Sequence, residues 1–298
     1  MNSPARLGRP ARIGRPARTS GPERTSGPER TSRPPRIGPT VRAEWTKAVT
    51  VPGTIAMLAL FIAVTAGTGI ASAAAARCGA PGCGQDPARI SLLGVQVGQA
   101  IAAVAGVLAI GSEYSTAMIH LTLAATPRRG QLLAAKAVVL SALVLPAAAI
   151  AVLCSALAAQ FILPGHGFTS AHGYLARSQL ALTLADGPML RAVLGSVLYL
   201  ALVSLLGLGV ACVVRDVAAA TGVALGLLYL FPLLGPAFGP DWARHLDQIA
   251  PMLAGLDIAA TQDLSALPLS PWQGLGVVAL WAAGALLCGS LSIRLRDA

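Results

Sequence analysis

Six apolar runs, each about as long as a helix that crosses a bilayer, divide most of this chain. A hydrocarbon core of about 30 Å needs roughly 20 helical residues, and their backbone polar groups must be hydrogen-bonded within the protein. Charged residues make up only 11% of the 298 residues, against about 25% in soluble domains. We therefore predict an all-α, polytopic membrane protein, with spans at residues 53–76, 91–111, 133–163, 190–214, 217–239 and 271–293.

The distribution of basic residues predicts how these spans are oriented. Of the 22 Lys and Arg residues, five lie in loops on one side of the predicted membrane and 17 in segments on the other side. Since cytoplasmic segments carry the excess of Lys and Arg, both termini are predicted to be cytoplasmic. The predicted outer loops are 77–90, 164–189 and 240–270. The last is rich in apolar residues, so it either re-enters the membrane or packs on the outer face.

The first 40 residues differ in composition from the rest of the chain. Residues 7–36 read as five hexads, LGRPAR, IGRPAR, TSGPER, TSGPER and TSRPPR. With so few apolar side chains to bury, residues 1–40 are predicted to be a disordered basic tail. Such a tail either contacts anionic lipid headgroups or is a dispensable extension. The net charge of +10 comes largely from it, and the remainder has no basic stripe with interleaved aromatics, so a nucleic-acid partner is not expected.

A short amphipathic segment follows the tail. Residues 41–50, VRAEWTKAVT, place Trp45 beside Glu44 and Lys47. Tryptophan and charged side chains side by side are typical of a helix that lies in the headgroup plane. We therefore predict an entry helix that leads through Pro52 into the first span.

Residues 111–136, GSEYSTAMIHLTLAATPRRGQLLAAK, are too polar to lie in hydrocarbon. We predict a helix over 112–125, with Ser112 as its N-cap and Glu113 at the positive end of its dipole. Tyr114 and Met118 would share one face of this helix and His120 the other. Pro127 is predicted to end it, and Arg128 and Arg129 form a basic turn before the third span.

No catalytic constellation is present in the sequence, so we do not predict an enzyme. The chain lacks the G-x-x-x-x-G-K-[ST] pattern of an ATP site, and its histidines do not form a metal-ligand set. No cofactor or metal is therefore predicted on this chain. Gln96 and Gln99 share a face of the second span and either line a cavity or form interhelical hydrogen bonds. Cys78 and Cys83 share the first outer loop, where the compartment would permit a disulfide.

The segments VRAEWTKAVTVPGT and GSEYSTAMIHLTLAATPRRGQLLAAKAVV resemble the permease subunits of type-2 ATP-binding-cassette exporters (the ABC-2 family), especially those of actinobacteria. The similarity extends from residue 41 to the C-terminus, and the run E-Y-S-T-x-M-I-x-x-T-L-A-A-x-P-R-R-G is its most specific part. The resemblance implies a six-span permease domain over 41–298, with 41–50 as entry helix and 112–125 as the coupling helix that docks on a cytoplasmic ATPase.

The same resemblance implies the partners and the residues that meet them. ATP and Mg²⁺ would bind a separate ATPase subunit, and two permeases would pair in the cell membrane, as a homodimer or a mixed pair. Glu113, Tyr114, Met118, His120, Arg128 and Arg129 would couple the chain to the ATPase. Because the spans are mainly apolar, the exported substrate is expected to be amphiphilic or hydrophobic. The alternative is a non-transporting membrane scaffold or regulator whose basic tail binds lipid.

Overall fold

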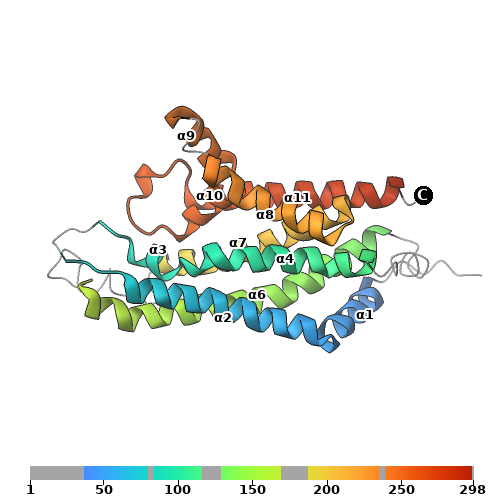
Figure 1. The fold of residues 1–298 in the computed structure, drawn as a ribbon, viewed down its shortest axis with the longest axis horizontal. Helices are drawn as coiled ribbons and strands as arrows, with labels where there is room; N and C mark the ends of the chain where they lie inside the picture. Colours follow the sequence, from blue (N-terminus) through green and yellow to red (C-terminus); the bar gives the residue numbers. More distant parts are fainter. Residues whose placement is uncertain (1–36, 80–83, 116–128, 169–186, 235–238, 297–298) are drawn as a thin grey trace, which may run out of the picture. The chain divides into compact units, whose positions relative to one another are not determined.

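The computed structural model describes residues 37–79, 84–115, 129–168, 187–234 and 239–296, all within one packing unit, Ile37–Ala298. Every regular element in these ranges is a helix, as Figure 1 shows. The long helices are α1 (Ile37–Thr50), α2 (Pro52–Ala75), α4 (Gly94–Ser115), α6 (Arg129–Ile162), α7 (Gly187–Val214), α8 (Val217–Leu234) and α11 (Pro271–Arg296). Shorter elements are α3 (Pro87–Ser91), η1 (Leu163–His166), α9 (Pro240–Ile249), α10 (Pro251–Leu256), η4 (Asp257–Ala259) and η5 (Leu264–Ala266).

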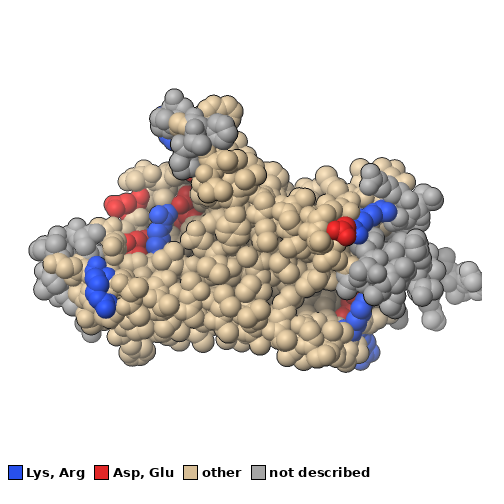
Figure 2. Space-filling view, in the orientation of Figure 1, with Lys and Arg blue, Asp and Glu red and all other residues tan. Residues whose placement is uncertain are grey.

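Six of these helices are long and apolar enough to cross a membrane, which confirms the predicted number of spans. The qualifying segments are Pro52–Ala75, Gly94–Gly111, Gly130–His166, Gly187–Val214, Val217–Leu234 and Pro271–Ile293. On the face in Figure 2 the described Lys, Arg, Asp and Glu side chains lie towards the two ends of these helices, with a band of uncharged residues between them. The chain is an all-α, multi-pass membrane protein.

Helices α4 and α7 form the centre of the bundle. Inside the protein, 72% of the α7 window and 61% of the α4 window are buried, against at most 39% for the other spans. Small residues allow the two backbones to meet. A Cβ atom on Gly106 of α4 would overlap the carbonyl oxygen of Ser204, and one on Gly207 of α7 would overlap that of Ala103. Close crossings of this kind hold helices together by van der Waals contact where lipid removes the hydrophobic driving force.

Two predicted boundaries were wrong. Helix α1 begins at Ile37, so residues 37–40 belong to a helix and not to the predicted tail. Helix α4 continues without a break to Ser115, so Ser112 is inside a helix and is not an N-cap. Apolar composition marks where hydrocarbon would end, but intrahelical hydrogen bonds continue past that point wherever no residue interrupts them. The remainder of the predicted tail and of the 112–125 helix lies outside the described residues.

The turn between the fourth and fifth spans is as tight as the sequence predicts. Only Arg215 and Asp216 separate α7 from α8. Arg215 has a left-handed backbone with φ of 65°, and its guanidinium donates to the carbonyl oxygen of Ser292 in α11 at 3.0 Å. The carboxylate of Asp216 accepts a hydrogen bond from the Ala219 N–H at 2.7 Å, which satisfies an otherwise unpaired donor in the first turn of α8.

The predicted apolar loop 240–270 is largely helical. Helix α9 is exposed, whereas α10 is buried between neighbouring helices. A Cβ on Gly255 of α10 would meet Tyr199 of α7 and Val278 of α11. Tyr199 lies about 18 Å from the first residue of α7, Gly187, at a rise of about 1.5 Å per residue. Of the two interpretations of this loop, the packing favours a segment that dips into the bundle.

Candidate functional site: a buried charge network joining three helices

Four charged side chains from three helices meet at the end of the bundle where α1 lies. The ammonium group of Lys136 donates to Glu113 Oε1 at 2.8 Å and to Glu44 Oε2 at 2.8 Å. It also donates to the carbonyl oxygen of Ala109 at 3.1 Å. Lys47 donates to the same Glu113 Oε1 at 2.5 Å. We call Glu44, Lys47, Glu113 and Lys136 the charge network; it connects α1, α4 and α6.

Local sequence explains how these side chains reach one another. Val51 has an extended backbone and Pro52 occupies the first turn of α2, so α1 ends there and the chain changes direction. Glu44 and Lys47 are three residues apart on α1 and therefore share a face. Glu113 follows Ala109 by one turn of α4. Lys136, near the start of α6, thus meets a carboxylate on each side.

The network divides into a buried pair and a more exposed pair. The Lys136 and Glu113 side chains are only 2% and 3% exposed, whereas Glu44 is 13% and Lys47 is 48% exposed. Buried charges are costly unless they are paired and hydrogen-bonded. Here two lysines and two glutamates cancel, and Lys136 uses its three protons on three acceptors. The arrangement therefore satisfies Lys136 inside the protein.

The network also controls the ionisation of Glu113. Burial by itself raises the pKa of this carboxyl, but the charges of Lys136 and Lys47 and their hydrogen bonds outweigh burial and lower the pKa below its ordinary value of 4.5. A carboxyl with a lowered folded-state pKa stabilises the fold above its unfolded pKa, and that contribution is lost as pH falls through the folded value.

We accordingly expect a pH-dependent stability that depends on Glu113. Above about pH 4.5 the contribution should be complete, and below it the melting temperature of the wild type should fall more steeply than that of Glu113→Gln, which carries no titratable group there. Thermal unfolding of both proteins in detergent across this range is the measurement. Parallel pH profiles for the two proteins would contradict the assignment.

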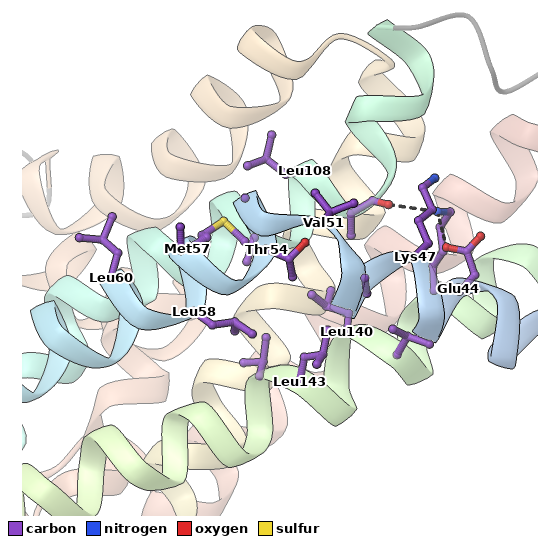
Figure 3. A pocket seen from close by; sticks show the side chains of 18 residues that line it. Glu44, Lys47, Val51, Thr54, Met57, Leu58, Leu60, Leu108, Leu140 and Leu143 are labelled. Carbon is purple, nitrogen blue, oxygen red and sulfur yellow. Dashed lines mark hydrogen bonds and ion pairs between the residues drawn. The ribbon is translucent and has the colours of Figure 1, made fainter.

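A pocket of about 550 Å³ opens beside the network, between α2, α4 and α6 (Figure 3). Its walls are almost entirely apolar, with Met57 and Leu60 from α2, Leu108 from α4 and Leu140 from α6. The charged groups lie together at one end of the pocket, where Glu44, Lys47 and Lys136 line it. This combination of an apolar lining with charged groups at one end is suited to binding an amphiphilic molecule or to movement between helices.

The residues predicted to contact an ATPase are placed only in part. Met118, His120 and Arg128 lie outside the described residues, and Tyr114 and Arg129 are placed as backbone at the end of α4 and the start of α6. Glu113 lies inside the protein instead of on its surface. The predicted entry segment lies within α1, where Trp45 is 41% exposed and Glu44 and Lys47 join the network.

Gln99 takes part in an interhelical hydrogen bond through its side chain, and Gln96 through its backbone carbonyl. The Tyr199 hydroxyl of α7 donates to Gln99 Oε1 in the core, and the Tyr229 hydroxyl of α8 donates to the Gln96 carbonyl oxygen at 2.6 Å. Neither glutamine lines the 550 Å³ pocket. Of the predicted cysteine pair, Cys78 is disulfide-bonded and Cys83 lies outside the described residues.

Sequence reasoning missed Lys136 as a site residue, although its signal was available. One of only two lysines in the chain, it lies close to the start of a strongly apolar run. An ionisable residue so close to hydrocarbon is by default a functional candidate with a partner. Its partners could not be read from the sequence, because Glu44 is 92 positions away along the chain.

No protein-family model matches this chain, and no curated protein matches it. The resemblance to ABC-2 permeases therefore depends only on the sequence segments quoted above, and membership of that family is a proposal.

Proposed function

We propose that this chain is the membrane-spanning subunit of an ATP-driven exporter of the ABC-2 type, acting in the cell membrane with a separate ATPase subunit. The observation that carries the proposal is the charge network. It joins α4 and α6, the two helices on either side of the predicted coupling segment, and it ties both to the entry helix α1. A force applied to that segment would therefore reach three helices together.

The network gives Glu113 a different role from the one that the resemblance implies. With its carboxylate held between Lys47 and Lys136, Glu113 positions α4 against α1 and α6 and does not itself meet the ATPase. Tyr114, Met118, His120, Arg128 and Arg129 remain the proposed contacts. An apolar anchor with polar neighbours suits a helix that docks in a groove of a partner.

Transport would follow from differential contact in two states. ATP closing the partner dimer would move the coupling segment, and the joined helices would move with it as a rigid group. A ligand or partner shifts such an equilibrium only through different contacts in the two states. With cytoplasmic termini, two paired permeases would provide the path, and the predominantly apolar spans favour an amphiphilic or hydrophobic substrate.

The experiment is a pull-down of the tagged chain from native membranes in mild detergent, scored for a co-purifying ATPase with a P-loop. We expect such an ATPase with the wild type, and about 30-fold less with Tyr114→Ala/Met118→Ala, since truncation of an interface hot spot costs about 2 kcal/mol. Trp242→Ala is the matched control: it removes an exposed aromatic from α9, away from the end of the bundle where α1 lies.

Two results would contradict the proposal in different ways. Recovery of an ATPase that the double variant does not diminish would place the docking site elsewhere. Purification without any ATPase, under conditions that hold a known permease complex together, would favour the scaffold or regulator interpretation.

A further inference from the structure

The pocket beside the charge network has two distinct chemical regions. Along its length it is lined by aliphatic side chains and methionine from α2, α4 and α6. Val51, Leu60 and Leu108 in this lining are also exposed at the protein surface, so the pocket opens sideways from the helices that can span a membrane. A molecule entering by that route comes from the lipid phase, and its body must be apolar.

The charged end of the pocket restricts the polar part of such a molecule. Glu44, Lys47 and Lys136 line it, and Glu113 behind them bonds both lysines. The four charges of the network sum to zero, so a headgroup with a net charge of either sign would bring an uncompensated charge against a partly buried site. A neutral headgroup that carries both signs would not. Charge complementarity therefore favours a zwitterion.

Individual groups at this end are available to such a headgroup. Lys47 has three ammonium protons and donates to Glu113 from a half-exposed position. Glu44 accepts from Lys136 through Oε2, and its side chain is 13% exposed. Because these residues are three apart on α1, a donor and an acceptor lie about 5–6 Å apart at their Cβ atoms.

We propose that this pocket binds a zwitterionic phospholipid, with one acyl chain between α2, α4 and α6, its phosphate at Lys47 and its primary ammonium at Glu44. Phosphatidylethanolamine has this chemistry. A phosphatidylcholine headgroup carries no N–H to donate, and phosphatidylglycerol carries an uncompensated negative charge. The bound lipid would fill the space beside the joint between α1 and the spans, which is a role separate from transport and from docking of the ATPase.

The test uses the full chain, without any ATPase, in nanodiscs of equal parts phosphatidylethanolamine, phosphatidylcholine and phosphatidylglycerol. After extraction into mild detergent, the lipid retained per chain is measured by mass spectrometry. We expect about one phosphatidylethanolamine per wild-type chain, and at least about fivefold less with Ala56→Phe, since its ring takes up the volume of the acyl chain. Ala56 lines the pocket on α2.

The matched control is Ala59→Phe. Ala59 is on the same helix and is exposed like Ala56, but it does not line the pocket, so its lipid retention should equal that of the wild type. If Ala56→Phe does not give monodisperse protein, Leu143→Trp fills the pocket from α6 instead. Glu44→Gln should shift the retained lipid towards phosphatidylglycerol, because it removes a negative charge.

Equal retention by the pocket-filling variant and by Ala59→Phe would overturn the site. Preferential retention of phosphatidylglycerol by the wild type, or equal retention of all three lipids, would overturn the choice of headgroup. Since no ATPase is present, either result leaves the proposed exporter function unaffected.

Discussion

Replacing Lys136 with methionine is expected to destabilise the protein by about 3–5 kcal/mol, the usual cost of removing one partner from a buried ion pair. The variant removes the buried cation beside Glu113, which keeps the half-exposed Lys47 as a partner, and it removes the cation bonded to Glu44. Methionine has a similar length and no charge, so packing changes little. Unfolding in mixed detergents, followed by far-ultraviolet circular dichroism, measures the loss.

Lys47→Met provides the control for this prediction, because Lys47 bonds the same oxygen of Glu113. Its side chain is 48% exposed, so the loss should be at most about 1 kcal/mol. A large difference between two lysines that share one acceptor would come from the burial of Lys136 and from its two further acceptors, Glu44 and the Ala109 carbonyl oxygen. Equal losses of stability in Lys136→Met and Lys47→Met would contradict the division of the network into a buried pair and a more exposed pair.

A double variant distinguishes the loss of the Glu113–Lys136 ion pair from the loss of the Lys136 side chain itself. Glu113→Gln/Lys136→Met removes both buried charges, and such replacements are often close to neutral because the charges that remain, Glu44 and Lys47, are the more exposed ones. We expect the double variant to be more stable than Lys136→Met alone, with a coupling of about 1–3 kcal/mol between the two sites. Additive losses would mean that Glu113 and Lys136 do not interact in the folded protein.

Replacing Gly106 with leucine is expected to cost about 3 kcal/mol, at the upper end of what overpacking usually costs. A Cβ at this position overlaps the backbone carbonyl of Ser204, and a backbone atom cannot move aside as the end of a flexible side chain can. Helices α4 and α7, which form the centre of the bundle, would have to separate. The same detergent unfolding measurement reports the change.

Gly67→Leu is the matched control, since Gly67 is an exposed helical glycine of α2 with no atom within 4 Å of an added Cβ. There the substitution should be neutral or stabilising by up to about 1 kcal/mol, because leucine is the better helix former. Comparable destabilisation at both positions would show that the α4–α7 crossing is not the cause.

A large part of the fold follows from local properties of the sequence. Twenty-residue apolar runs can satisfy their backbone only as helices in a membrane, so the six spans are predicted without knowledge of their neighbours. The break at Pro52 and the turn at Arg215–Asp216 also fall at local sequence signals. Proline alone does not end every helix, however, since α6 continues through Pro146 and α8 through Pro232.

The tertiary structure decided everything that depends on which helices are neighbours. The sequence alone marked Glu113 as a polar residue near a helix end, but only the crossing of α1, α4 and α6 shows that it is buried between Lys47 and Lys136. Likewise, Gly255 of the apolar loop is shown to pack between α7 and α11 only by the fold. Hydropathy depends on each residue separately, whereas the pairing of buried charges and small residues depends on helix packing that joins positions far apart in the chain.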